Sequence, residues 1–197
     1  MKRAVTLLLA SVVLLLLPES ASAQRFGGEF GGGGGFWLVY ADLGIDVDRS
    51  FGHDVGGVVT LGGRGFLQTG KVRLGGGAFG GGFVDEGLNS AGNRVQGGFS
   101  AGGFTAEYLI VQQNLELVIG GMAGGGVLTI EEIVIVSGGV EDLRRRRESM
   151  FVGYPWVRVG YNPAPFINVG LQLGYVAGTQ DVGGFAIGLD VMAGLIP

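Results

Sequence analysis

Apolar and polar residues alternate one for one in three segments of the chain. In residues 36–47 the odd positions are apolar, while the even positions include Asp42 and Asp46. The same alternation returns in residues 167–175 and 184–191. Because successive side chains of a strand point to opposite sides, a period of two predicts β-strands with one apolar face.

Glycine blurs the alternation in five further segments, although the strand pattern is still visible in each. These segments are residues 55–67, 70–83, 95–110, 114–130 and 150–161. After the first 23 residues, no segment shows the apolar period of 3.6 that is typical of an amphipathic helix. The sequence therefore predicts an all-β chain of about eight strands.

Short and long connections alternate between the predicted strands. The short turns fall near residues 68–70, 112–113 and 162–165. The long, more polar connections fall at residues 48–54, 84–94 and 131–149. In an antiparallel up-and-down sheet alternate connections lie at opposite ends, so all the long loops are expected at one end.

This asymmetry resembles that of outer-membrane β-barrels, which have an even number of strands, short periplasmic turns and longer external loops. The resemblance is architectural, because no family motif accompanies it. It implies a single antiparallel up-and-down β-barrel, rich in glycine, over residues 36–197. Two features depart from the pattern. The sequence ends in Leu-Ile-Pro instead of an aromatic residue, and Pro155 falls within a predicted strand, where we expect a bulge between Tyr154 and Trp156.

The direction of the apolar face separates two kinds of barrel. In a membrane barrel it points outward to lipid, and the residues expected there are Trp37, Leu43, Ile45, Leu171, Leu173, Ile187 and Leu189. In a soluble, lipocalin-like barrel it points inward. Glycine stretches such as residues 75–77 and 80–82 would then form an outer surface with almost no charge, which protects poorly against association. We therefore favour the membrane barrel.

The composition is that of an exported protein with little polar surface. A charged start, an apolar run and small residues at 21–23 predict a signal peptide over residues 1–23. Residues 24–35 are a glycine-rich stretch that we expect to be a flexible leader. Charged residues make up 15% of the chain where about 25% is usual, and glycine accounts for 43 of 197 residues. Since there are no cysteines, closing the sheet on itself would take the place of disulfides.

Sequence strings that elsewhere bind cofactors lack their structural context here. Gly75-x-Gly77-x-x-Gly80 matches a dinucleotide-binding string, but no βαβ pattern surrounds it. Val72 stands where a phosphate loop needs Ser or Thr. The single histidine, His53, lies in a predicted loop, and no group of His, Asp and Glu has metal-ligand spacing. We therefore expect no enzyme, no cofactor and no metal.

The strongest local concentration of charge is the run Arg144, Arg145, Arg146 and Arg147 in the predicted loop 131–149. Such a run is either simply solvated or binds phosphates and carboxylates of lipid headgroups, surface glycans or a neighbouring subunit. A nucleic-acid partner is not expected, because no aromatic residues are interleaved and the chain is exported. We expect this loop to be the most accessible one.

Charges of both signs are expected in the narrow interior of the barrel. Counting positions along antiparallel strands places the following residues at mid-height or nearer the short turns: Asp42, Arg64, Lys71, Arg73, Glu116, Arg158 and Asp190. An unpaired charge is costly in such an interior, so we expect a network that closes the lumen to ions. Alternatively, the blurred register sends some of them outward, Lys71 and Arg73 first.

The function expected from these patterns is that of a small structural or interaction barrel of the outer membrane. Its partners would be membrane lipid and, through the long loops, a surface partner or a further copy of the chain. The alternative is a secreted soluble barrel that binds an apolar ligand or lipid, or self-assembles.

Overall fold

The computed structural model describes residues 30–43, 57–84, 87–88, 92–112, 114–136, 140–179 and 182–195. The strands in these ranges are β1 (Phe30–Ala41), β2 (Val58–Thr69), β3 (Val72–Phe83), β4 (Gly87–Leu88), β5 (Arg94–Gln112), β6 (Leu115–Val136), β7 (Val140–Ala164), β8 (Ile167–Gly178) and β9 (Gly183–Leu195). Within the described ranges no helix is long and apolar enough to cross a membrane.

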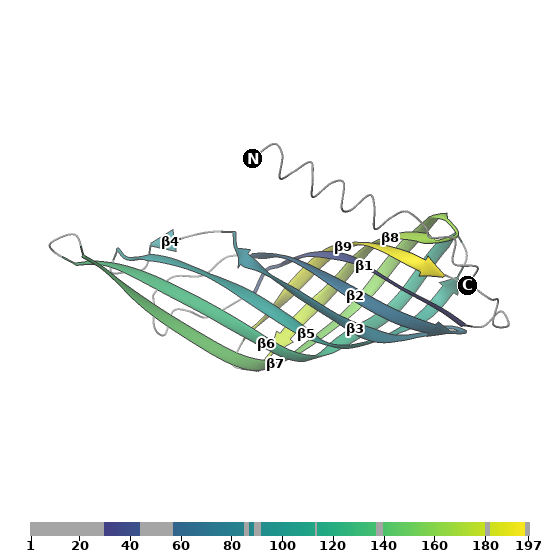
Figure 1. Cartoon of the computed structure of the whole chain (residues 1–197), viewed down its shortest axis with the longest axis horizontal. Helices are drawn as coiled ribbons and strands as arrows, with labels where there is room; N and C mark the ends of the chain where they lie inside the picture. The colour runs from purple at the N-terminus through teal and green to yellow at the C-terminus, as the bar shows by residue number, and fades with distance from the viewer. Residues whose placement is uncertain are drawn as a thin grey trace.

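The eight long strands form one closed antiparallel barrel (Figure 1). Each long strand pairs with its neighbours along the chain, β3 pairs with β5 past the short β4, and β1 closes the ring with β9. The predicted fold class, a single up-and-down barrel of about eight strands, is confirmed.

Three short turns lie together at one end of the barrel, which we call the turn end. The tightest is the two-residue turn Gly70-Lys71 between β2 and β3, where Gly70 has a φ of 54°. This left-handed conformation favours glycine, because it has no Cβ to clash with the backbone. The other two turns join β5 to β6 and β7 to β8. The barrel also begins at this end, since Phe30 lies opposite Thr69.

At the opposite, outer end three strands run far beyond the others. Figure 1 shows β5, β6 and β7 extending to the left of the barrel, with β4 beside them. The prediction of a long loop over residues 131–149 is therefore wrong. Strand β6 continues to Val136 and β7 begins at Val140, directly opposite it. The sequence reads as a loop because a sheet outside the barrel needs no alternation of apolar and polar faces.

Of the other two predicted long loops, one contains a short strand and one lies outside the described residues. The loop at residues 84–94 contains the two-residue strand β4, which pairs with the start of β5. The loop at residues 48–54 and His53 lie outside the described residues.

The first strand begins earlier than the pattern predicts. Residues 30–35, expected to belong to a flexible leader, form the first half of β1, and Gly32, Gly33, Gly34 and Gly35 pair with both β2 and β9. A run of glycines has no side-chain pattern to reveal a strand, but its backbone groups pair on both sides. Residues 24–29 and the predicted signal peptide lie outside the described residues.

The predicted facing of β1 is also wrong. Trp37 and Leu43 were expected on the outer wall, but both are fully buried. Both faces of β1 are apolar, since Phe36, Leu38 and Tyr40 occupy the exposed positions. The polar residues that produced the alternation, Asp42 and Asp46, lie beyond the end of β1 at Ala41. They therefore do not indicate which face of the strand points outward. Ile45 lies outside the described residues.

In β8 and β9 the predicted facing is correct. Leu171, Leu173, Ile187 and Leu189 are all exposed on the outer wall, at 45–61% of their surface. Their neighbours along each strand point inward and are buried, apart from Gly174, which is half-buried. A band of large apolar side chains therefore covers the outside of the barrel.

No bulge forms at Pro155. The pairs Gly153↔Ala177 and Trp156↔Gly174 on either side of it have the same register. A proline without an N–H thus interrupts the ladder with β8 without shifting it. The register shift of this strand pair lies instead between Tyr161 and Ala164.

The barrel interior is filled with side chains and has two zones. The outer zone is an apolar cluster that includes Val39, Phe79, Phe99, Met150 and Val152. Aromatic rings from β1 and β7 form its floor, in stacked, edge-to-face and tilted pairs with centroids 5.2–5.7 Å apart. The zone nearer the turn end is polar and charged.

Candidate functional site

The charged zone is built from six inward-facing side chains on six different strands. They are Arg64 on β2, Arg73 on β3, Glu107 on β5, Glu116 on β6, Arg158 on β7 and Asp190 on β9. None of them is more than 7% exposed. Three guanidinium groups thus face three carboxylates, and the zone is neutral when all are ionised.

Arg158 lies at the centre of this zone. Its Nε donates to both carboxylate oxygens of Asp190 at 2.9 and 3.0 Å, and its Nη2 donates to Oδ1 at 2.8 Å. Its Nη1 approaches Glu116 at 3.4 Å, and Nη2 also donates to Asn168. A guanidinium that is completely buried therefore has charged or polar acceptors on three sides.

Arg73 makes the second set of contacts. Its two terminal nitrogens donate to the two oxygens of Glu116 at 3.0 and 2.9 Å, in the bidentate geometry that fits a guanidinium to a carboxylate. Its Nε donates to Gln68 Oε1 at 2.7 Å, and the group lies 5.0 Å from the ring centre of Phe66. Another oxygen, on Glu107, lies 3.9 Å from Nη1.

Arg64 completes the set. It donates to Glu107 at 2.6 Å and to Asp190, and it lies 5.5 Å from the ring centre of Trp37 and 5.9 Å from that of Trp156. The indole N–H of Trp156 donates to the same Glu107 oxygen at 3.1 Å. Arg64 thus joins the charged zone to the aromatic floor of the apolar zone.

The contacts form a closed ring in which cations and anions alternate. The order around the ring is Arg73, Glu116, Arg158, Asp190, Arg64, Glu107 and back to Arg73. Every charge has an opposite charge on both sides, which offsets the desolvation of burial. We call these six residues the charge ring.

Sequence reasoning placed five of the six residues in the interior and missed Glu107. Two other assignments are wrong. Asp42 is exposed at the end of β1, because this strand has the opposite facing to the one predicted, and Lys71 is exposed in the β2–β3 turn. Glu107 lies directly opposite Arg73. That pairing joins β3 to β5 across a long connection, so no tight turn fixes its register in the sequence.

The arginine run lies on a strand, not in a loop. Arg144, Arg145, Arg146 and Arg147 belong to β7 and pair with residues 129–132 of β6. All four are exposed. The run is thus presented on a rigid sheet that projects beyond the barrel.

Carboxylates surround the arginine run. Arg145 Nε donates to Glu131 at 2.6 Å, and Arg146 forms an ion pair with Glu148. Arg144 lies directly opposite Glu132. The hydrogen bond from Arg145, followed by one from Gln96, lowers the pKa of Glu131 below its ordinary value of 4.5. The run is therefore largely neutralised by its own sheet and is not a bare basic patch.

The described residues offer little to a metal ion. Among them, no group of three or more His, Cys, Asp and Glu side chains is placed to hold one. The carboxylates of the charge ring already accept from guanidinium groups.

The fold has counterparts among solved structures. Neisserial surface protein A matches with a TM-score of 0.53 and 10% identity over 83% of this chain and 96% of that chain. Ail, the attachment invasion locus protein of Yersinia pestis, solved with the heparin analogue sucrose octasulfate, matches with a TM-score of 0.50 and 15% identity over 85% of this chain and 99% of that chain. No protein-family model and no curated protein sequence matches the chain. Its closed ring of eight long strands is the fold of the small outer-membrane β-barrels.

Proposed function

We propose that this chain is a small, closed barrel of the outer membrane that anchors an interaction surface, the sheet projecting from its outer end. Three features support the membrane anchor: the fold, the band of large apolar side chains on the outer wall, and the position of the described charges, which lie in the interior and at the ends. The filled interior argues against a channel and against a ligand site inside the barrel. We propose no enzymatic role.

The observation that carries the interaction role is the free edge of β7. Strand β8 ends at Gly178 opposite Val152, so residues 140–151 of β7 run past it. In the described ranges no strand covers this edge beyond Phe151. An uncovered strand edge is a template for an extended segment of another chain.

The hydrogen bonds at Phe151 show which backbone groups are available. Its N–H donates to Thr179 Oγ1 at 3.2 Å and its carbonyl accepts from the N–H of Thr179 at 3.0 Å, so both groups point away from β6. In an antiparallel pair alternate residues point the same way. Ser149, Arg147 and Arg145 therefore present an N–H and a carbonyl along the free edge.

The side chains favour an acidic strand as the occupant. Arg147 lies opposite Thr129 of β6, so it has no carboxylate directly across the ladder. A carboxylate on an added strand would face Arg147 from the other side and complete the cross-strand ion pair that Thr129 cannot make. Ail was solved with the heparin analogue sucrose octasulfate. Here Glu131, Glu132 and Glu148 lie against three of the four arginines, and the charge that remains on Arg147 suits one carboxylate of a strand better than a multiply sulfated glycan.

A synthetic peptide of alternating glutamate and valine tests this proposal on the purified protein in detergent. Binding is measured by fluorescence polarisation. Ser149→Pro removes a free-edge N–H and leaves the ladder to β6 intact, whereas Ser149→Ala keeps the N–H. Leaving one buried acceptor without a donor costs about 1–3 kcal/mol, so we expect about tenfold weaker binding for Ser149→Pro alone.

Three outcomes would contradict the proposal. The first is absence of peptide binding, and the second is equal binding by the Ser149→Pro and Ser149→Ala variants. The third is that heparin displaces the peptide to the same extent from these two variants. Recovery of the mature protein in the soluble fraction without detergent would contradict the membrane anchor itself.

A further inference from the structure

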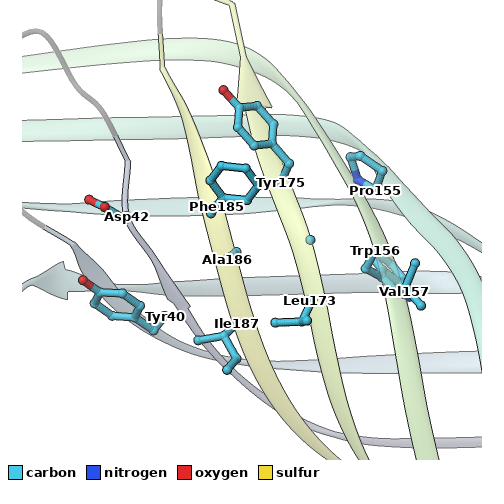
Figure 2. Close-up of a pocket in the computed structure, with 11 residues that line it drawn as sticks. Tyr40, Asp42, Pro155, Trp156, Val157, Leu173, Tyr175, Phe185, Ala186 and Ile187 are labelled. Carbon is cyan, nitrogen blue, oxygen red and sulfur yellow. The ribbon is translucent and has the colours of Figure 1, made fainter.

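A groove of about 590 Å³ crosses the outer wall of the barrel over β1, β9, β8 and β7. Figure 2 shows the side chains that line it. It lies on the side of the barrel where the strands are short, close to the outer end of β1, β8 and β9. The free edge of β7 begins just beyond Phe151, which lies four residues from Pro155 on the same strand, so the groove and the projecting sheet are adjacent features of one face.

The walls of the groove are two successive rows of outward-facing side chains. The row nearer the turn end consists of Tyr40, Ile187, Leu173 and Val157, which are consecutive partners across the four strands. The row nearer the outer end consists of Asp42, Phe185, Tyr175 and Pro155. This second row is held together by the hydrogen bond from Asp42 N to the Phe185 carbonyl and by the edge-to-face contact of Phe185 with Tyr175 at 5.4 Å.

Small residues and a proline leave space between the two rows of larger side chains. Between the two rows the floor is formed by Gly174 and Ala186, of which the first has no side chain and the second points inward and is buried. Pro155 cannot donate to β8, and its short ring lies at the β7 side of the lining (Figure 2). The result is a groove that runs across four strands instead of a gap between two neighbouring strands.

The chemistry of the lining identifies the occupant. The groove is continuous with the apolar band of the outer wall, where Leu173 and Phe185 expose 61% and 79% of their surface. In an outer-membrane barrel such a band faces the hydrocarbon of the bilayer. Among the described lining residues only Asp42 is charged, and its carboxylate lies near the outer end, beside the phenol of Tyr40. We propose that the groove binds one acyl chain of a membrane lipid whose headgroup carries an ammonium, with that headgroup at Asp42.

This inference depends on the membrane anchor, but not on strand pairing at β7. An acyl chain gains apolar contact on two walls and a floor, which a flat barrel wall does not offer. The headgroup preference follows from charge: an ammonium is attracted to Asp42, whereas a headgroup with only phosphate is repelled by it.

Native mass spectrometry of the barrel in mild detergent tests the site. Phosphatidylethanolamine and phosphatidic acid with identical acyl chains are added separately, and the protein with one lipid retained is quantified. We expect one phosphatidylethanolamine to be retained in preference to phosphatidic acid. Leu173→Trp fills the groove and should lower retention by about tenfold.

Two control variants keep the test independent of folding. Leu171→Trp places the same ring on the same strand and face, outside the groove, and should retain lipid like the unaltered protein. Asp42→Asn should retain lipid but lose the preference between the two headgroups.

Equal retention by the two tryptophan variants, or none by the unaltered protein, would overturn the acyl-chain site. An unchanged preference in Asp42→Asn, or a preference for phosphatidic acid, would overturn the headgroup assignment. Partition into membranes, measured on the same samples, shows separately whether the membrane anchor holds.

Discussion

Removing one charge from the charge ring should destabilise the barrel strongly. Asp190 is 2% exposed and accepts hydrogen bonds from both Arg158 and Arg64. In Asp190→Asn, three buried guanidinium groups face two carboxylates, and two of the three lose an ionised partner. Removing one member of a buried ion pair costs about 3–5 kcal/mol, chiefly because the remaining charge is left desolvated without compensation.

The assay is urea unfolding of the protein folded into lipid vesicles, followed by tryptophan fluorescence. With a slope of roughly 2 kcal/mol per molar urea, a loss of this size lowers the unfolding midpoint by about 2 M. Asp42→Asn is the matched control, since it removes an exposed carboxylate from the outer wall. The vesicles are made of phosphatidylglycerol, whose headgroup has no ammonium for Asp42 to bind. We expect this substitution to change the free energy of unfolding by less than about 0.5 kcal/mol.

A charge-balanced double variant separates electrostatics from packing. Arg158→Gln combined with Asp190→Asn leaves two cations and two anions in the ring, and it should be less destabilised than the sum of the two single variants. If Asp190→Asn unfolds at the same urea concentration as Asp42→Asn, or if the two ring substitutions are additive, the ring does not act as a coupled unit.

Three further outcomes follow from the geometry. In Gly75→Ala the new Cβ would overlap the carbonyl of Gly65, whereas in Gly76→Ala it would lie 3.5 Å from the carbonyl oxygen of Gly103, an ordinary contact. The free energy of unfolding measured in urea should therefore fall by about 1–3 kcal/mol in the first variant and hardly change in the second. The pKa of Glu131 is lowered in the folded protein, so its hydrogen bond with Arg145 contributes stability above pH 4.5 that is lost as the pH falls through the lowered pKa. Pepsin should then cut the projecting ends of β6 and β7 faster with falling pH. A Glu131→Gln variant should lose this pH dependence. The purified protein should show no steady conductance in planar bilayers, and a stable open channel would refute a filled lumen.

The strand pattern and the turns were predictable because they depend on local sequence. Period-two alternation and the short turns place the strands within the barrel and order them correctly. The extension of β6 and β7 was not predictable in this way. Outside the barrel both faces of a sheet meet water, and residues 140–149 then resemble a polar loop.

The charge ring was partly predictable for a related reason. Charges are rare in this chain, and those near the short turns can be placed by counting from the turns, which brings Arg64, Arg158 and Asp190 to one level. Facing could not be derived for β1, because the outer zone of the interior is as apolar as the outer wall. This is why Trp37 was assigned outward and Asp42 inward, and why both assignments fail.

The abundance of glycine also has a physical reason at the charge ring. A Cβ on Gly170 would overlap the guanidinium of Arg158, and one on Gly160 would lie 2.6 Å from its Nη1. Since Arg158 is held by Asp190, Glu116 and Asn168, it cannot move aside cheaply. These two glycines therefore provide the volume that a buried arginine needs in a narrow barrel. By contrast, a Cβ on the exposed Gly125 would meet nothing within 4 Å, so only part of the glycine content is required by the interior.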